Sequence, residues 1–255
     1  MHHATPVPPG KADLHVHTDL GDGMMSIDEL LAHVEHHTDL ACLAITDHDE
    51  LRSSHRARDL AVQRGLRFQV VPGMEVTTRE GHLLALFLES PVPSLRSLQE
   101  TVEAVHRQGG ISVVPHPMSW LTHSVGQSTL DRLAEAGVPL HGLEVANPTY
   151  AGQVAGRRVL ERNRVRYRWA ETGGSDAHFL RFVGLAYTLF PGRSAEELRD
   201  SLEAGITQAR LVAPIRPSQV GASALIRQQF RALVVQPLRL FRRMMPLARP
   251  FPPQP

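Results

Sequence analysis

Cysteine is nearly absent from this 255-residue sequence, and long apolar runs are missing altogether. The single thiol, Cys42, excludes an internal disulfide bond, and its place in the apolar run LACLAI favours burial over reactivity. The sequence has no apolar N-terminal segment typical of secretory leaders and no uninterrupted apolar run of about 18 residues. We therefore expect a cytoplasmic protein that does not span a membrane.

Acidic residues are missing from the C-terminal tail. All 26 Asp and Glu residues lie at or before Glu203, whereas residues 204–255 contain eight arginines. Residues 1–203 hold 19 basic side chains against those 26 acidic ones, a net formal charge of −7, and the tail carries +8. Because most of the chain is acidic, its composition does not indicate a nucleic-acid surface that extends over the whole protein.

Strands and helices alternate along the chain, whose 42% apolar and 21% charged residues are typical of a globular protein. Seven strands are predicted, at about residues 12–17, 40–46, 67–71, 82–88, 111–115, 142–146 and 167–171. Helices are predicted at about residues 26–36, 50–64, 94–108, 128–136 and 151–163 and from 194 onward, with Ser26, Ser94 and Ser194 as N-caps. This alternation indicates a largely parallel sheet and favours a closed or nearly closed β/α barrel.

Side chains that can bind metal recur where the predicted strands end. His15 and His17 are two residues apart on the first strand, so they point to the same face. With those at the later strand ends, the candidates are His15, His17, Asp22, His48, Glu75, His82, His116, Asp176 and His178. Because functional residues of parallel β/α proteins gather at the carboxyl ends of the strands, this repetition indicates one shared site.

The residue types of this set suit metal chemistry. Imidazoles and carboxylates without thiolates suit zinc, manganese or iron. Nine ligands are too many for one ion, because a catalytic zinc takes about three protein ligands, so they divide among two or three ions. Closely spaced divalent ions generate a hydroxide at neutral pH and clamp the attacking and leaving oxygens of a phosphoryl transfer.

In their order along the chain, the motifs resemble those of the PHP (polymerase and histidinol phosphatase) superfamily. The motifs are HVHTDLGDG from His15, TDHD from Thr46, GME ending at Glu75, GHLL from Gly81, PHP around His116 and SDAH from Ser175. The resemblance covers about residues 11–205 and implies a distorted seven-stranded β/α barrel with a trinuclear metal cluster. One departure is Gly21, where the family often has serine. We expect no chemical consequence, because that residue is not a ligand.

The resemblance also implies how the ligands are shared. His15, His17, Glu75 and Asp176 would hold one ion. Glu75 would bridge to a second ion, held by His82 and His116. Asp22, His48 and His178 would hold the third.

Acidic neighbours of the motifs have more than one interpretation. Asp49 is interpreted as an N-cap or first-turn acid of the helix at 50–64. Asp47 is a candidate to orient a ligand histidine, and Glu144 is interpreted as structural or as a similar orienting residue. Four residues are candidates for substrate contact: His123, Asn147, Arg181 and Arg193. Asn147 fits equally well as a turn residue before Pro148.

The basic tail, residues 211–255, contains an amphipathic segment. In ALIRQQFRALVV, apolar residues recur at helical spacing beside Arg227 and Arg231, and Pro237 is expected to end this helix. The helix could pack on the acidic body of the barrel, or dock on an anionic membrane surface or a partner, and both interpretations stay open. We expect residues 1–10 to be flexible and residues 11–210 to form the catalytic domain.

Together these features predict a metal-dependent phosphoesterase. It would hydrolyse a small phosphate monoester, related to a nucleotide or an amino acid, with a metal-bridging hydroxide as nucleophile. The sequence has no convincing G-x-S-x-G motif or P-loop, so no protein nucleophile is needed. One alternative is a 3′-5′ exonuclease that trims DNA or RNA ends, for which the basic tail would supply phosphate contacts. The other is a non-catalytic, metal-stabilised regulatory module.

Overall fold

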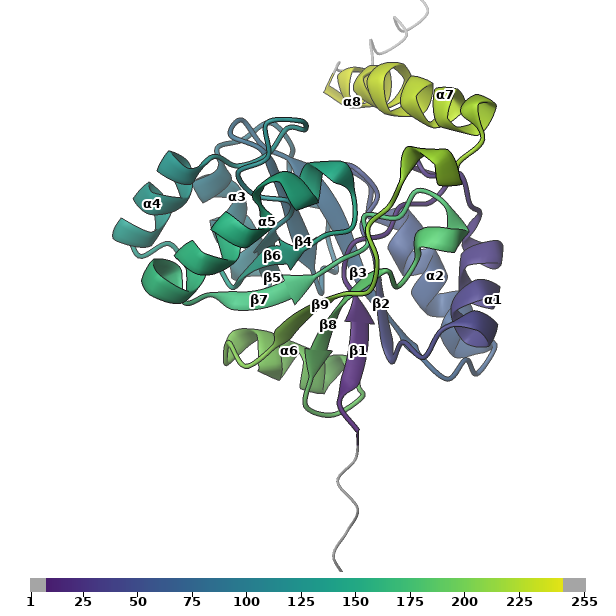
Figure 1. The fold of residues 1–255 in the computed structure, drawn as a ribbon, viewed down its shortest axis with the longest axis horizontal. Helices are drawn as coiled ribbons and strands as arrows, with labels where there is room; N and C mark the ends of the chain where they lie inside the picture. The colour runs from purple at the N-terminus through teal and green to yellow at the C-terminus, as the bar shows by residue number, and fades with distance from the viewer. Residues whose placement is uncertain (1–7, 245–255) are drawn as a thin grey trace, which may run out of the picture.

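Nine strands form a single curved sheet in the computed structural model, which describes residues 8–244 (Figure 1). Along the sheet they follow the order β7-β6-β5-β4-β3-β2-β1-β8-β9. In chain order the strands are β1 (Gly10–Asp13), β2 (Cys42–Ile45), β3 (Gln69–Thr77), β4 (His82–Leu86), β5 (Ile111–Val114), β6 (Gly142–Ala146), β7 (Ala170–Gly173), β8 (Ala186–Phe190) and β9 (Gln208–Leu211). The predicted α/β distorted barrel is confirmed, and β8 and β9 are additional to the seven predicted strands.

Two of the strands run against both of their neighbours. β1, β2 and β3 are parallel to one another, as are β5, β6 and β7, whereas β4 lies antiparallel between β3 and β5. β8 is antiparallel to both β1 and β9. Neither β8 nor β9 is a continuous apolar run, because β8 alternates buried and half-buried side chains and β9 is largely exposed. The periodicity that revealed the other strands is therefore weak here.

Side-chain hydroxyl groups close the barrel where β7 meets β8 and β9. The Thr188 hydroxyl on β8 accepts a hydrogen bond from the Gly173 N–H at 2.9 Å and donates to the Gly173 carbonyl at 3.0 Å. The Thr207 hydroxyl donates to the Glu171 carbonyl at 2.9 Å. These contacts occupy backbone groups at the edge of β7 that would otherwise be open to pairing with another chain.

Helices cover the outside of the barrel. They are α1 (Ile27–His37), α2 (Arg52–Gln63), α3 (Leu98–Arg107), α4 (Gln127–Glu135), α5 (Tyr150–Arg162), α6 (Ala195–Glu203), α7 (Ala222–Phe230) and α8 (Gln236–Met244). Shorter helical turns are η1 (Asn163–Tyr167), η2 (Leu180–Phe182), η3 (Pro217–Gln219) and η4 (Arg231–Val235). In α1 the buried residues are Ile27, Leu30, Leu31 and Val34, so one apolar stripe faces the sheet.

Serine N-caps begin three of these helices. Ser26 and Ser194 start α1 and α6 with capping boxes, as predicted. The predicted cap Ser94 was wrong: Ser97 caps α3, and Ser94 donates a hydrogen bond to Asp49 instead. Of Ser94 and Ser97, only Ser97 is followed three residues later by a glutamate, Glu100, which completes the reciprocal hydrogen bonds of a capping box.

The first strand is shorter than predicted. β1 ends at Asp13, so His15 and His17 lie in the extended segment beyond it. Val16 in that segment forms an isolated parallel bridge with Ala177, which keeps the backbone extended. The two imidazoles therefore still project to one side, as alternation along an extended chain requires.

The hairpin of β3 and β4 explains the place of two further candidates. β3 is longer than predicted and includes Glu75. Thr77 at its end pairs with His82 at the start of β4. Because β4 is antiparallel, its first residue lies at the carboxyl end of β3, on the same face as the ends of the parallel strands.

The C-terminal segment returns to this carboxyl-end face. α7, η4 and α8 form a rod above the ends of the strands, on the side opposite α6 (Figure 1). Pro237 was expected to end the helix, but it lies within the rod as the second residue of α8. The π-helical turn η4 precedes it and widens the backbone, which accommodates a residue without an N–H.

Residues 1–7 and 245–255 lie outside the described part of the chain. The flexibility predicted for residues 1–10 therefore stays a prediction for most of that segment, but Gly10 begins β1. Among residues 8–244, no helix is both long enough and apolar enough to cross a bilayer.

Candidate metal centre

All nine side chains of the motifs meet at the carboxyl-end face of the barrel. They come from the segments after β1 and β2, from β3, from the start of β4, and from the segments after β5 and β7. Four overlapping groups of three have potential ligand atoms within 4.8 Å of one another. The nine side chains are His15, His17, Asp22, His48, Glu75, His82, His116, Asp176 and His178, and we call them the cluster.

Four donor atoms in the cluster have the spacing of a single coordination shell. His15 Nε2 lies 3.1 Å from Glu75 Oε2 and 3.5 Å from Asp176 Oδ1. His17 Nε2 lies 3.3 Å from each of the same two oxygens. Ligands held about 2.0–2.1 Å from a tetrahedral ion lie about 3.3–3.4 Å from one another. One ion therefore fits between these four atoms.

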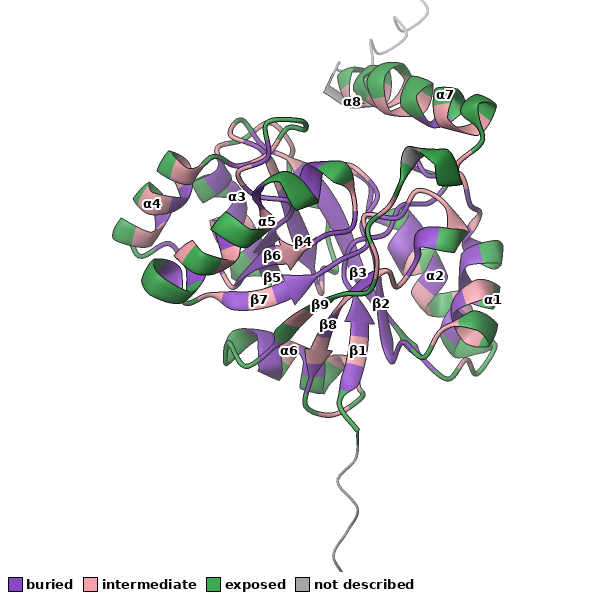
Figure 2. Cartoon of the chain, viewed as in Figure 1, coloured by how far each residue is buried: buried purple, intermediate pink, exposed green. Residues whose placement is uncertain are grey.

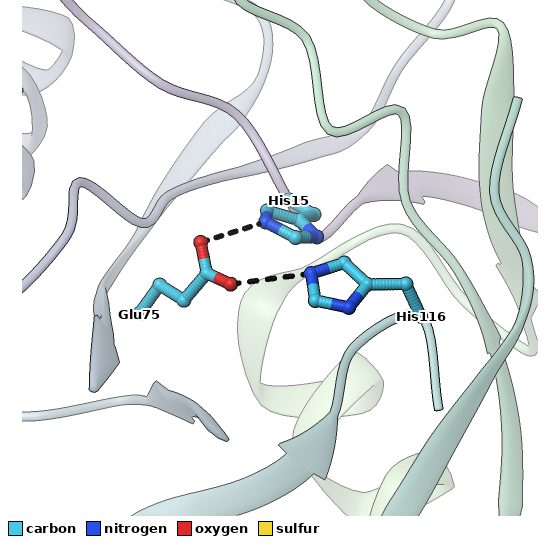
Figure 3. A group of neighbouring side chains, drawn as sticks. All are labelled: His15, Glu75 and His116. Atoms are coloured by element: carbon cyan, nitrogen blue, oxygen red, sulfur yellow. Dashed lines mark hydrogen bonds and ion pairs between the residues drawn. The ribbon is translucent and has the colours of Figure 1, made fainter. Parts of the chain in front are cut away.

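Glu75 connects this group to a second one. Its other oxygen, Oε1, lies 2.8 Å from His82 Nδ1 and 3.4 Å from His116 Nε2. Figure 3 shows the carboxylate between His15 and His116, with one oxygen directed toward each ring. A carboxylate placed in this way can bridge two closely spaced ions.

A third group lies on the other side of His17. Asp22 Oδ2 is 3.0 Å from His178 Nε2, and Asp22 Oδ1 is 3.6 Å from His17 Nδ1. The His17 ring stacks on the rings of His178 and His48, with centroids 4.3 and 5.0 Å apart. His48 Nδ1 is also 3.4 Å from Glu75 Oε2. His17 therefore lies near both the first group and the third group, and so does His48.

Three histidines have one ring nitrogen engaged by the protein. Nδ1 of His15 lies 3.1 Å from Glu144 Oε1, and Nδ1 of His116 lies 2.8 Å from Ser124 Oγ. Nδ1 of His178 donates to the Asp176 carbonyl at 3.0 Å. Such partners fix the tautomer and the orientation of metal-binding imidazoles. Each of these rings turns its Nε2 toward the carboxylates of the cluster.

Buried polar atoms without a hydrogen-bond partner mark the centre of the cluster. Among the described residues they include both ring nitrogens of His17, Asp22 Oδ1, Glu75 Oε1 and His82 Nδ1. Unsatisfied buried polar atoms are rare in folded proteins and are destabilising. Divalent ions would satisfy the two carboxylate oxygens, His82 Nδ1 and one ring nitrogen of His17, and the imidazole and carboxylate donors suit zinc, manganese or iron.

The charges within the cluster favour a bound cation. Burial alone would raise the pKa of Glu75, but His48 and the other imidazoles around it hold that pKa well below its ordinary value. Burial lowers the pKa of His17 to about 4, so its ring is neutral at pH 7 and offers lone pairs. Burial opposes protonation of His178 as well, yet Asp22 raises its pKa to about 9. Ionised carboxylates thus draw positive charge into the cluster, and a divalent ion supplies it while displacing protons.

The backbone around the cluster is tightly constrained. A Cβ at Gly174 would lie 2.4 Å from Glu144 Oε1 and 2.6 Å from His15 Cβ, so only glycine fits there. Asp176 and His116 have φ angles of +50° and +30°, which are strained for residues other than glycine. Strain of this kind is found where a site dictates the geometry of the chain.

A cavity of about 610 Å³ opens onto the cluster. The barrel lines it with residues that include His48, His82, His116, His123, Phe179 and Phe182. The rod roofs it with Leu225, Gln228, Gln229, Ala232 and Leu233. Gln228 is buried, and its Nε2 lies 3.4 Å from Asp22 Oδ2, so the roof reaches a candidate ligand.

A larger hollow of about 840 Å³ lies elsewhere, between the start of α2, residues 89–96 and Leu240 of α8. It contains none of the nine side chains of the cluster. The smaller cavity, which opens onto the cluster, is therefore the one in which a substrate could reach the candidate metal ligands.

Asp47 holds the loop after His17 rather than a histidine ring. Its carboxylate accepts hydrogen bonds from the Thr18 N–H at 2.6 Å and from the Thr18 hydroxyl at 2.5 Å. A Cβ at Gly21 would lie 2.4 Å from Asp47 Oδ1. A larger side chain at Gly21 would therefore disturb the contact with Asp47. The expectation that this departure has no chemical consequence for the ligands stays a prediction.

Asp49 is not the cap of α2. That helix has Leu51 as its N-cap residue, without a side-chain hydrogen bond. Asp49 instead accepts hydrogen bonds from the Thr77 N–H at 2.9 Å and from the Thr77 hydroxyl at 2.8 Å. Its own φ of +54° turns the carboxylate away from the helix toward the end of β3.

Of the four candidate substrate contacts, only His123 lines the cavity. Its ring centroid lies 5.3 Å from that of His82. Asn147 is buried, donates to Glu144 Oε2 at 2.7 Å and accepts from the Thr149 N–H at 2.9 Å. These contacts fit the turn interpretation of Asn147.

The two arginines lie away from the cavity. Arg181 donates a hydrogen bond to the Gln219 carbonyl, in the segment that leads to the rod. Arg193 directly precedes α6, where its N–H donates to Glu197. In Figure 1, α6 lies at the end of the barrel opposite the rod. Neither placement fits a phosphate contact at the cluster.

Two residues at the site were not foreseen from the sequence. Ser124, beside His116, stands in a loop whose composition is unremarkable. Gln228 is separated from Asp22 by 206 positions along the chain. The helical spacing of the tail predicted the helix that carries Gln228, but not the surface on which that helix lies.

Comparisons with known proteins agree with this geometry. A family model described as PHP-associated matches residues 161–207. An uncharacterized protein of Methanocaldococcus jannaschii is 31% identical over 162 residues, which cover 60% of this chain and 90% of the relative. The 5′-3′ exoribonuclease Rnm of Salmonella typhimurium is 34% identical over 88 residues, 33% of this chain and 30% of that enzyme. A phosphoribosyl 1,2-cyclic phosphate 1,2-diphosphodiesterase of Eggerthella lenta is 33% identical over 132 residues, 49% of this chain and 43% of that enzyme.

The fold is shared with a solved structure. A two-domain protein from Bacteroides vulgatus, described as containing a predicted PHP-like metal-dependent phosphoesterase, superimposes with a TM-score of 0.62. The sequences are 22% identical, and the match covers 82% of this chain and 67% of the other. The chain spans less than half of either enzyme named above, so the likeness to them is one of domain, not of whole protein.

Proposed function

Because the chain belongs to the PHP family of metal-dependent phosphoesterases, we propose that it hydrolyses a small phosphate ester at the cluster. Two or three divalent ions, of zinc, manganese or iron, would be held by the nine side chains. The observation that carries the proposal is a set of four nitrogen–oxygen distances of 3.1–3.5 Å, between two imidazoles and two carboxylates at the floor of a roofed cavity.

The ligand groups that we propose are those that the family resemblance implies. His15, His17, Glu75 and Asp176 would hold the first ion, Glu75, His82 and His116 the second, and Asp22, His48 and His178 the third. Such ions lower the pKa of a coordinated water, so that hydroxide is available near pH 7, and they neutralise phosphate charge. Glu144 would keep the proton of His15 on Nδ1, which leaves Nε2 free as a ligand.

Other residues of the cavity would position the ester. His123 Nε2 donates to the Thr78 carbonyl at 2.8 Å, which fixes the ring and leaves Nδ1 for a hydrogen bond to substrate. Phe179, Phe182 and Leu225 offer an apolar wall for the remainder of the molecule. A combination of apolar walls and a few polar groups is usual in small-molecule sites.

The roof favours a small substrate. A volume of about 610 Å³ suits a molecule of mononucleotide size, since such pockets commonly span about 300–1,000 Å³. A longer strand would have to leave the cavity past α7 and η4. The diphosphodiesterase relative, whose name describes a small cyclic phosphate, supports the same substrate class.

An exonuclease is the second candidate. The relative Rnm is named as a 5′-3′ exoribonuclease, a polarity opposite to the 3′-5′ direction that the sequence alone suggested. The arginines of the tail would favour phosphate contacts along a strand. A module without turnover fits less well, because the side chains of His48, Asp176 and His178 keep 20%, 13% and 18% exposure toward the cavity side of the cluster.

The test compares two substrates on the same protein. Full-length protein, loaded separately with zinc, manganese or iron, is given nucleoside monophosphates and bisphosphates, and in parallel a 5′-phosphorylated oligonucleotide. We expect phosphate release from the small esters and slow or no shortening of the oligonucleotide. Faster shortening would assign the second candidate, and no reaction with any metal or substrate would refute the proposal.

A matched pair of variants ties the activity to the cluster. Asp176→Asn removes a ligand charge and should abolish phosphate release. Asp39→Asn changes an exposed carboxylate that pairs only with Lys11 at the surface, and should leave the rate unchanged. Equal activity of Asp176→Asn and the wild-type protein would place the reaction elsewhere.

A further inference from the structure

The outward side of the C-terminal rod is apolar. Its exposed apolar side chains are Ile226, Phe230, Val234, Leu238 and Phe241, which are 39–69% exposed. In Figure 2 the outer surface of α7 and α8 is mostly exposed, and the half-buried residues lie toward the barrel. A helix on a water-soluble domain normally turns its apolar stripe inward, so this orientation is inverted.

Polar side chains hold the rod in this orientation. Arg231 donates to the Gly21 carbonyl at 2.8 Å, and Arg239 donates to the Leu20 carbonyl at 2.5 Å. Gln228 is buried beside Asp22. The loop of residues 19–22, which carries a candidate ligand, therefore fixes which side of the rod faces out.

Positive charge borders the apolar side. Arg227 and Arg242 on the rod are exposed. A hollow beside α8 is lined by Arg239 and Arg242 together with Arg56 of α2, and by Arg52, which forms an ion pair with Glu50. No acidic residue follows Glu203 in the sequence, so nothing on the rod offsets this charge.

We propose that this apolar, arginine-bordered side of the rod docks on an anionic membrane surface. Apolar side chains enter the boundary between headgroups and acyl chains, while arginines attract the anionic headgroups. A second copy of the chain is a poorer occupant, because two such sides in contact would bring arginine against arginine with no acidic partner on either rod. The inference does not depend on which ester the cluster hydrolyses.

Cosedimentation of the full chain with vesicles tests the proposal. We expect binding to vesicles of phosphatidylcholine with phosphatidylserine, little binding to phosphatidylcholine alone, and weaker binding as salt rises. The double variant Phe230→Ser and Phe241→Ser should lose about tenfold or more in partitioning, since each exposed ring contributes apolar area to insertion. Val165→Ser, in η1 rather than the rod and 80% exposed, is the control for an exposed apolar residue and should bind as the wild type does.

A fluorescent label reports where the protein touches the lipid. Phe230→Cys and Val165→Cys can each be labelled at one place, because the native thiol of Cys42 is buried. An environment-sensitive dye at position 230 should shift its emission on anionic vesicles, whereas the dye at 165 should not. Three results would overturn the proposal: no binding to anionic vesicles, binding unaffected by the phenylalanine variants, or a concentration-dependent dimer abolished by those same variants.

Discussion

Replacing Glu144 by glutamine tests how the protein sets the proton of His15. Glu144→Gln keeps the volume of the side chain but puts an amide NH₂ where one oxygen stood. In the structure Oε1 lies 3.1 Å from His15 Nδ1. Oε2 accepts from the His116 N–H at 2.8 Å and from Asn147 Nδ2 at 2.7 Å. Because these two donors need an acceptor, the glutamine oxygen takes the place of Oε2 and its NH₂ faces His15.

This orientation reverses the tautomer of His15. An NH₂ opposite Nδ1 requires that nitrogen to accept, so the proton moves to Nε2, the atom that faces Glu75 and Asp176. A protonated Nε2 cannot bind an ion. Loss of such a partner lowers metal affinity about 10- to 100-fold, or about 1.4–2.7 kcal/mol. In the opposite orientation the NH₂ of the glutamine would face the two buried donors of His116 and Asn147. That arrangement would cost about 1–3 kcal/mol for each group left without an acceptor.

Competition with a chromophoric chelator measures the affinity, and urea unfolding in excess chelator measures stability without metal. Glu171→Gln is the matched control, because Glu171 lies opposite Leu143 on the neighbouring strand and pairs with Arg164 near the surface. We expect weak metal binding for Glu144→Gln and wild-type binding for Glu171→Gln. If Glu144→Gln bound metal as tightly as the wild type, the role given to Glu144 would be refuted.

Three further results are expected. Gly174→Ala should weaken metal binding and destabilise the fold by about 1–3 kcal/mol, because its Cβ would lie 2.4 Å from Glu144 Oε1. Gly156→Ala is the control in urea unfolding, because its Cβ would meet its nearest atom at 3.4 Å. If both variants lost the same free energy of unfolding, the steric role given to Gly174 would be contradicted. Burial raises the pKa of the Cys42 thiol to about 12, so a thiol reagent should label it only as the protein unfolds; fast labelling of the native protein would contradict burial. Removing metal with a chelator should lower Tm. Adding an ion back at about 100 times its Kd should increase the free energy of unfolding by about 2.7 kcal/mol. A Tm that does not change with metal would count against metal binding by the cluster.

The candidate ligands could be predicted because each stands beside a local signal. Asp176 and His178 follow a short strand and a glycine pair, and His116 lies between two prolines after an apolar run. In a largely parallel sheet such places share one face, so position along the chain was enough to predict that they meet. The structure brings all nine together, although the strand that carries Glu75 is longer than its apolar core suggested.

Features that depend on distant pairing were not predictable in the same way. That His82 lies beside Glu75 follows from the reversal of β4, and an apolar strand does not reveal its direction. The strand β9 is largely exposed, and β8, which contains Thr188, is not a continuous apolar run of the kind on which the prediction rested. Ser94 and Ser97 both precede α3, and the glutamate three residues after Ser97 decides between them.

Helical periodicity in the sequence did not predict which side of the C-terminal rod faces the barrel. Helical spacing in ALIRQQFRALVV identifies an apolar side and a polar side, and the usual inference is that the apolar side faces the core. Here part of the surface beneath the rod is the loop of residues 19–22, whose carbonyl groups accept hydrogen bonds from Arg231 and Arg239. Apolar side chains would leave those carbonyls and Asp22 without partners, whereas arginine and glutamine satisfy them. The polar face of the metal centre therefore determines which side of the rod turns inward, and the outward apolar side follows from the chemistry of the site beneath it.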